Sequence, residues 1–231
     1  MKTTTLLVGL GLLVPSMMQA ASTSYFLDDG TGESGLGGYG TTTVWLNSFT
    51  SQAGAEYIQK VSISFGGSGA NPTTYNGMAF GVHVWSDPNN DGNPDDAVLL
   101  ESGSGVISDF SNTSNGASTG FVEFTLDSAA YIASGNSFFV GMSMYFNQNV
   151  LGPARDTSSN EGRSWMYRWN GDVANSAPGS MSTALNKNNY DDILGGNAMI
   201  RAEGVSSVPE PSSSVLFGLT GAIGLMRRKR S

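Results

Sequence analysis

The chain contains no cysteine and a single histidine, His83. Without cysteine the chain forms neither disulfides nor thiolate metal sites. This absence does not assign the protein to the cytosol, because an exported domain with a large core folds without disulfides. His83 lies in the middle of an expected strand beside bulky residues, which favours a structural role for it.

Charged residues are also scarce, at 13% of the chain, about half of the roughly 25% typical of globular domains. Between Ser22 and Ser207 there are 6 basic and 18 acidic residues, which gives this body a net charge of −12. Such a surface repels phosphate backbones, so nucleic acid is not an expected partner. The same surface attracts divalent cations.

No segment outside the two ends shows sustained helical periodicity, and 31 glycines with many Ser, Thr and Asn residues separate short apolar stretches. In residues 78–86, for example, Phe80, Val82 and Val84 alternate with the intervening residues and share one strand face. GTGESGLGG, at residues 30–38, follows no strand–helix pattern and is expected to be a loop. The expected strands are Thr42–Thr50, Tyr57–Gly67, Met78–Ser86, Ala97–Ser108, Gly120–Ser128, Ser137–Phe146, Gly162–Gly171 and Asn197–Gly204.

This pattern predicts an all-β fold, a single antiparallel β-sandwich that is jelly-roll-like. An N-terminal signal helix and a short C-terminal apolar helix are expected to flank it. The predicted organisation is a signal peptide at 1–21, a β-sandwich domain at 22–204, a linker with a Pro-Glu-Pro motif at 205–214, and an apolar helix with a basic tail at 215–231.

The N-terminus, MKTTTLLVGLGLLVPSMMQAAST, has the parts of a Sec-type signal peptide. Lys2 provides the positive charge, and Leu6–Val14 is an apolar run of 9 residues, too short for a bilayer that needs about 20. Small residues follow, and cleavage is expected after Ala20 or Ala21. The protein is therefore predicted to be exported by the Sec machinery.

The C-terminus begins with Pro209, Glu210 and Pro211. The uncharged stretch Val215–Met226 follows, whose 12 residues make about 18 Å of helix against a hydrocarbon core of about 30 Å. The chain then ends in the basic residues Arg227, Arg228, Lys229 and Arg230, which stay on the cytoplasmic side. The segment is suited to transient insertion in the inner membrane, with Pro-Glu-Pro just outside it.

These three parts, in this order, resemble the PEP-CTERM sorting signal. The resemblance implies that an exosortase recognises the signal and removes the tail. It also implies a Gram-negative bacterium that makes extracellular polysaccharide, and delivery to the cell envelope, surface or extracellular matrix. The body, with YFLDDGTGESGLG, VSISFG, VHVWSDPNNDGNPDD, SFFVG and AMIRAEG, resembles a loosely defined β-sandwich module of bacterial surface proteins, which implies fold more than activity.

DPNNDGNPDD, at residues 87–96, matches the first part of an EF-hand-type calcium loop, with Gly92 at the sixth position where the chain must turn sharply. Position 12 is Val98, so Asp96 or Glu101 would have to replace the bidentate glutamate. The alternative is a polar hairpin loop, in which the same residue types are favoured by turn chemistry. Asp28, Asp29 and Glu33 form a second acidic cluster, which is either a calcium site or a solvated loop. The predicted ligands of a structural Ca²⁺ are Asp87, Asn89, Asp91, Asn93 and Asp95.

Trp165, Tyr167 and Trp169 alternate along GRSWMYRWNGD and therefore share one strand face. If they are exposed, they form a platform for sugar rings, with Arg163, Asn170 and Asp172 available for sugar hydroxyls. If they are buried, they belong to a core, because each ring buries a large apolar area.

The sequence as a whole predicts an exported, exosortase-processed surface protein with a structural or adhesive role, associated with exopolysaccharide and without catalytic activity. One alternative is a carbohydrate-binding module with a calcium-stabilised loop. A polysaccharide-active enzyme is a further alternative, and it requires two facing carboxylates in a cleft.

Overall fold

The computed structural model describes residues 22–38, 40–66, 76–108, 120–146, 150–171, 181–189 and 195–207. Outside these ranges lie both expected end helices, Asp172, and the predicted processing and sorting residues Ala20, Ala21, Pro209, Glu210, Pro211, Arg227, Arg228, Lys229 and Arg230. Within the described ranges, no helix has the length and apolar character needed to cross a membrane.

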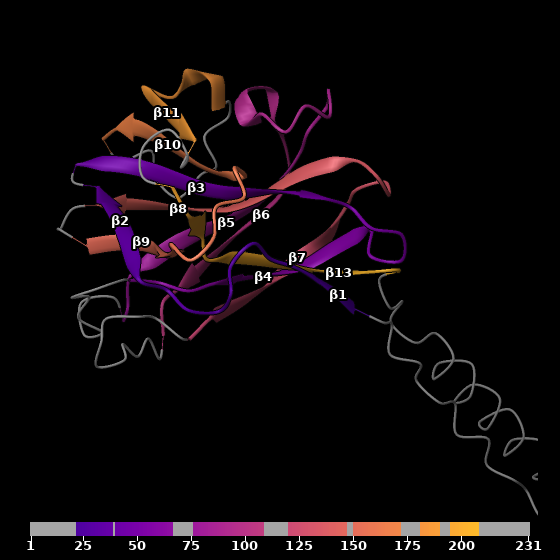
Figure 1. Ribbon diagram of the computed structural model, residues 1–231, viewed down its shortest axis with the longest axis horizontal. Coiled ribbons are helices and arrows are strands. Elements are labelled where there is room, and N and C mark those ends of the chain that lie inside the picture. The colour runs from indigo at the N-terminus through magenta and orange to yellow at the C-terminus, as the bar shows by residue number, and fades with distance from the viewer. Residues whose placement is uncertain are drawn as a thin grey trace, which may run out of the picture.

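Two large sheets face each other (Figure 1). The four-stranded sheet has the order β1-β13-β4-β7 and consists of β1 Ser22–Tyr25, β13 Ile200–Val205, β4 Tyr57–Ile63 and β7 Val122–Tyr131. The six-stranded sheet has the order β11-β10-β3-β8-β5-β6 and consists of β11 Asn186–Asn189, β10 Ser164–Asn170, β3 Thr41–Thr50, β8 Ser137–Phe146, β5 Ala79–Ser86 and β6 Val98–Val106.

A small sheet and two short 3₁₀ helices complete the described elements. The sheet has the order β12-β9-β2 and consists of β12 Asn197–Ala198, β9 Val150–Asp156 and β2 Ser34–Gly38. Strands β2 and β9 lie at the left end of the sandwich in Figure 1. The 3₁₀ helices are η1 Pro94–Asp96 and η2 Met181–Thr183.

The strand pairing is that of a jelly roll. Strand β1 pairs with β13, β3 with β8, β4 with β7 and β5 with β6, and every pair is antiparallel. The outermost strands of the chain pair first and the pairs nest inward, while successive pairs alternate between the two sheets. A long hairpin rolled into two sheets has this pattern. The predicted all-β, jelly-roll-like sandwich is therefore confirmed.

The main core lies between the two sheets. Phe80, Val82 and Val84 of β5 point into it, as their alternation predicted. The ring of Tyr25 in β1 meets the ring of Phe138 in β8 edge to face, with centroids 5.2 Å apart. This contact joins a strand of one sheet to a strand of the other, and such aromatic pairs stabilise a core beyond their buried area.

A second apolar cluster covers the opposite face of the six-stranded sheet. We call it the outer core, and its buried members are Val44, Leu46, Trp85, Phe139, Tyr167, Trp169 and Met181. Met181 comes from η2, so a segment far along the chain covers this face. The middle of the six-stranded sheet is thus buried on both sides, since β3 is buried at every position from Thr42 to Phe49 and β5 from Phe80 to Trp85.

One expected loop is a strand. Residues 34–38 form β2, which pairs with β9, with a register shift between Gly35 and Gly37. The loop prediction was wrong here because a partner strand remote in sequence supplies the backbone hydrogen bonds that glycine-rich segments lack on their own.

Candidate functional site

The Asp87 loop, residues 87–97, joins β5 to β6 and folds over the outer side of the six-stranded sheet. Asp87 is buried, and its carboxylate accepts hydrogen bonds from the backbone N–H groups of Asn90, at 2.9 Å, and Gly92, at 2.7 Å. Asn90 has φ 61° and Gly92 has φ 77°. Asn and Gly are the residues that adopt this left-handed region most readily, so the sequence of the loop suits its turn.

Three carboxylates converge in this loop. Oxygens of Asp87, Asp91 and Asp96 lie within 4.8 Å of one another. Two oxygens bound to one Ca²⁺ at 2.3–2.6 Å cannot lie further apart than about 5 Å, so this spacing is compatible with a shared ion. Asp96 thus occupies the place for which the sequence offered it as a substitute ligand.

The other predicted calcium ligands are engaged differently. The side-chain oxygen of Asn89 accepts the N–H of Asp91 at 3.0 Å, and that of Asn93 accepts the N–H of Asp95 at 3.1 Å. Asp95 points away from the cluster, because the 3₁₀ turn of η1 directs it toward Tyr167. Calcium binding at the Asp87 loop stays a prediction.

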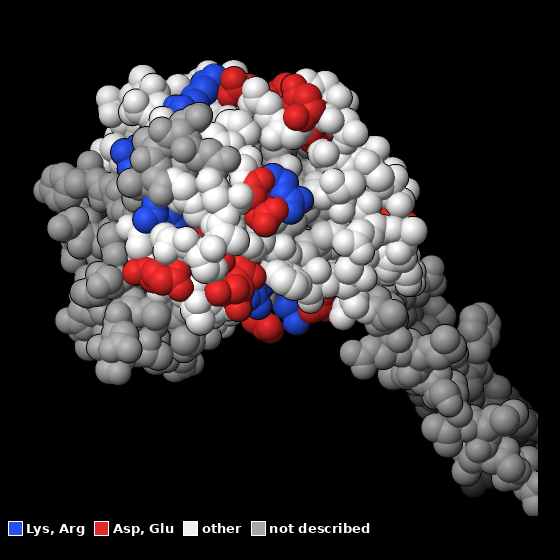
Figure 2. Space-filling view, viewed as in Figure 1, with Lys and Arg blue, Asp and Glu red and all other residues white. Residues whose placement is uncertain are grey.

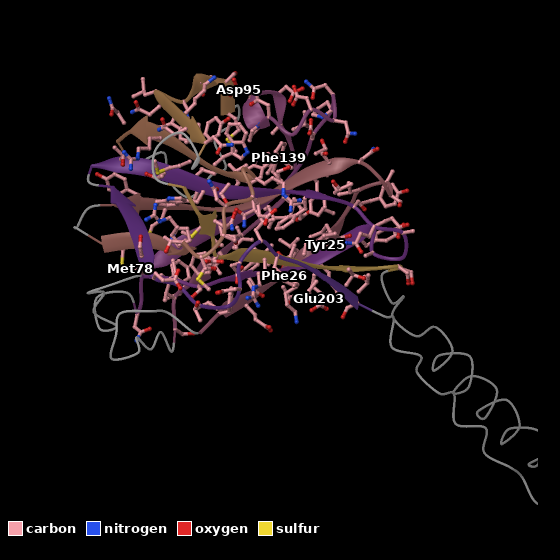
Figure 3. All side chains as sticks on the ribbon, in the orientation of Figure 1. Tyr25, Phe26, Met78, Asp95, Phe139 and Glu203 are labelled. Carbon is pink, nitrogen blue, oxygen red and sulfur yellow. The ribbon has the colours of Figure 1, made fainter. Side chains whose placement is uncertain are left out.

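Contacts at both ends hold the loop to the sheet. Near its start, the side-chain oxygen of Asn90 accepts the backbone N–H of Ser137. Near its end, Asp95 Oδ1 accepts the Tyr167 hydroxyl at 3.1 Å and lies 3.2 Å from Lys187 Nζ. Burial, and after it the negative charge of Asp95, raises the pKa of Tyr167 far above its usual value, so the hydroxyl stays a donor. Figure 3 shows Asp95 on the opposite side of the molecule from Glu203 of the four-stranded sheet.

The three aromatic residues of β10 do share one face, but they differ in burial. Tyr167 is 1% exposed and Trp169 is 9% exposed, and their rings are stacked 6.3 Å apart in the outer core. Neither ring presents a free face for a sugar in this structure. Trp165 is partly buried at the edge of the outer core, so the sugar-stacking prediction now depends on Trp165 alone.

Trp165 borders a hollow of about 420 Å³ between the Asp87 loop and the start of β10, which we call the Trp165 pocket. Its floor is the outer side of β3 where that strand approaches its end. It is lined by Ser48, Thr50, Asn90, Asp91, Gly92, Asn93, Ser137, Gly162, Arg163 and Trp165. The backbone on its β10 side is fixed by hydrogen bonds from Ser48 N to Arg163 O, at 2.9 Å, and from the Asn189 side chain to Gly162 O, also at 2.9 Å.

The second acidic cluster is rearranged relative to the sequence expectation. Asp28 forms an ion pair with Arg201. Asp29 and Glu33 instead lie with Asp156, a fully buried residue, their oxygens within 4.8 Å. Hydrogen bonds from Thr31 lower the pKa of Asp29. Asp156 was missed because it is remote in sequence and approaches only through the pairing of β9 with β2.

His83 is buried, as a structural role requires. Its Nε2 lies 2.8 Å from Ser143 Oγ, and burial lowers its pKa to about 4. His83 is 0% and Ser143 is 2% exposed, so a substrate cannot reach this pair in the structure.

The described chain is thus a jelly-roll domain with a small polar pocket on its outer face. Residues 207–231 match the family described as the PEP-CTERM protein-sorting motif. This match confirms the prediction for the C-terminus, and it marks the chain as a secreted protein that is sorted to the cell envelope as an exosortase target. No curated protein sequence matches the chain.

Two solved structures are similar to the body. One is the cysteine protease and lectin-like domains of Cwp84, a surface layer associated protein of Clostridium difficile. It is 15% identical, with a TM-score of 0.45 over 78% of this chain and 37% of that chain. The other is the clostridial cysteine protease Cwp84 after propeptide cleavage, 15% identical, with a TM-score of 0.46 over 80% of this chain and 40% of that chain. The chain therefore spans well under half the length of either.

Proposed function

We propose that the Sec machinery exports this protein and that an exosortase then trims it in a Gram-negative bacterium. The product has a structural or adhesive role at the cell surface or in the extracellular matrix, associated with extracellular polysaccharide and without catalytic activity. The observation that carries this proposal is the sorting motif at residues 207–231.

The placement of the two ends supports processing of a folded domain. Strand β1 begins at Ser22, directly after the expected signal cleavage site, and β13 ends at Val205, two residues before the sorting motif. Ser22 and Val205 are partners in the β1–β13 ladder. Cleavage on either side of this ladder leaves every described strand intact, so the jelly roll persists as the mature product.

The chemistry of the described residues supports a binding role more than hydrolysis. A glycosidase needs two carboxylates flanking one bond, about 5–10 Å apart. Among the described residues that line the Trp165 pocket, Asp91 supplies the one carboxylate. The carboxylate of Asp87, its neighbour in the acidic cluster, is buried and accepts backbone N–H groups of its own loop.

Sorting can be tested by neutralising the tail. Changing Arg227, Arg228, Lys229 and Arg230 to Gln removes the charges that hold the end in the cytoplasm. In the host we expect this variant to accumulate at full length in the inner membrane, whereas the native protein is shortened and reaches the envelope or medium. A matched control, Arg228→Lys with Lys229→Arg, keeps all four charges and should mature normally. Normal shortening of the neutral variant, or of the native protein in a strain without exosortase, would contradict the proposal.

Association with polysaccharide can be tested separately. In a host strain that cannot make its extracellular polysaccharide, the shortened protein should move from the cell-bound fraction to the medium. An unchanged distribution between the two fractions would show that the polysaccharide does not retain it.

A further inference from the structure

The outer face of the six-stranded sheet changes character along β3. Val44 and Leu46 point outward and are buried in the outer core. Two positions further on, the same face presents Ser48 and then Thr50, which line the Trp165 pocket. Strand β10 changes in parallel, because Tyr167 is fully covered whereas Trp165 borders the pocket. Among the described residues, the buried outer core thus gives way to polar side chains along this face.

Polar side chains line much of this pocket. Ser48 is 6% exposed, whereas Asn90 and Asn93 are exposed and use their side-chain oxygens within the protein. The hydroxyl and the side-chain N–H groups of these residues suit a ligand that accepts and donates hydrogen bonds. The indole Nε1 of Trp165 is buried and has no partner among the described residues, which is unfavourable for a donor.

The charges in the pocket nearly balance. The lining contains the carboxylate of Asp91 and the guanidinium of Arg163, and the latter lies 3.8 Å from Glu161. A phosphate or another strong anion would meet Asp91 and the net negative body, and an apolar ligand would leave the polar lining unpaired. On the face shown in Figure 2, charged groups form small clusters of both signs separated by uncharged surface.

We propose that the Trp165 pocket binds one neutral sugar residue of a polysaccharide, which gives the association in the proposed function a defined site. A sugar ring has an apolar C–H face that can pack on the indole of Trp165 and hydroxyls that match the polar lining. The volume of about 420 Å³ is toward the small end of the roughly 300–1,000 Å³ range of ligand pockets, as expected for a single sugar unit.

The mature protein, purified from the host, is tested on an array of neutral oligosaccharides of glucose, galactose, mannose and N-acetylglucosamine, with oligogalacturonate as the anionic set. The neutral oligosaccharide retained best is then titrated calorimetrically. Trp165→Ala should weaken its binding about tenfold or more, because the stacking surface is lost. Ser48→Ala should weaken binding about fivefold, because one hydrogen bond is lost. Tyr131→Ala is the matched control, since Tyr131 is a 57% exposed aromatic residue on β7, outside the pocket, and binding should not change.

Trp165→Phe shows whether a loss of binding in Trp165→Ala comes from misfolding. It keeps an aromatic face and should retain the affinity of the native protein within a few-fold. Retention of no neutral oligosaccharide, retention of oligogalacturonate alone, or full affinity in Trp165→Ala would overturn the proposal. Equal losses in Trp165→Ala and Tyr131→Ala would also overturn it, because binding would then not be located in the pocket.

The sorting proposal is read independently, from the shortening and the location of the protein in the host. Normal sorting without sugar binding therefore rejects the pocket alone. Sugar binding by a protein that is not shortened by exosortase rejects the sorting proposal alone.

Discussion

Acidification is expected to destabilise the protein through His83. Its Nδ1 has no partner among the described residues, and no nearby charge compensates for burial of the ring, so burial lowers its pKa from 6.5 to about 4. In the unfolded chain the imidazole binds a proton as the pH falls through about 6.5. The folded protein resists this proton until about pH 4. Between these values the unfolded state binds more protons, so stability falls as the pH falls.

The size of this effect follows from the two pKa values. The interval from 6.5 to about 4, at about 1.4 kcal/mol per pH unit, corresponds to a loss of about 3 kcal/mol in the free energy of unfolding. For a protein of this size, that lowers the melting temperature by about 6–12 °C. Carboxylates such as Asp29, whose pKa is lowered, add to acid destabilisation, so the contribution of His83 must be isolated.

The assay is urea unfolding of the mature protein and of His83→Gln at several pH values from about 7 to about 4. The variant keeps a polar side chain but has no titrating ring. The native protein should lose about 3 kcal/mol more than the variant over this range, and the difference should level off below about pH 4. Parallel pH dependence of the two proteins would refute the reasoning, because His83 would then not be buried in its neutral form.

Three further outcomes are expected in melting and unfolding experiments. If the Asp87 loop holds calcium, the melting temperature should be lower in excess EDTA than in calcium. With free calcium at a hundredfold above its Kd, the lost stabilisation is about 2.7 kcal/mol. An unchanged melting curve rejects the calcium site. Tyr167→Phe should lower the free energy of unfolding by about 1.5 kcal/mol, because the hydrogen bond to Asp95 is lost while the ring stays buried. In a double-mutant cycle, Tyr167→Phe and Asp95→Asn should be coupled. Additive effects of the two substitutions would count against the contact. Trp169→Ala should cost about 3–5 kcal/mol in urea unfolding, because it opens a cavity in the outer core, and a loss below about 1 kcal/mol would place the ring outside it.

Alternation within β5 predicted which of its side chains share the face toward the main core. Phe80, Val82 and Val84 were assigned correctly, because residues two apart in a strand lie on the same face. Alternation does not show what covers the other face, and β5 is in fact buried on both faces. Strand β3 is likewise buried on both faces. Its outer cover comes from η2, and no local pattern in β3 indicates which distant segment will pack there.

Local spacing also predicted only part of the Asp87 loop. Counting along the chain selected Asp87 and Asp91, which do lie together, and it selected Asp95, which does not. The reason is geometric, because η1 has about three residues per turn, so successive side chains point in different directions rather than alternating. Asp95 therefore reaches Tyr167, whereas Asp96 returns to the cluster. The Trp165 pocket was beyond local reasoning, because its walls come from β3, β8, β10 and the Asp87 loop.

Asp91 belongs both to the predicted calcium site and to the proposed sugar site. Its carboxylate is part of the acidic cluster and also lines the Trp165 pocket. A calcium ion bound by the cluster would fix Asp91 and the loop that forms one wall of the pocket. Sugar affinity should then be higher in calcium than in EDTA, and the sugar must raise calcium affinity by the same factor, since coupling between two binding sites is reciprocal. Paired titrations of the mature protein measure both factors. Equal sugar affinity in the two buffers would mean that the hydrogen bonds of Asp87, Asn90 and Asp95 hold the wall in place without an ion.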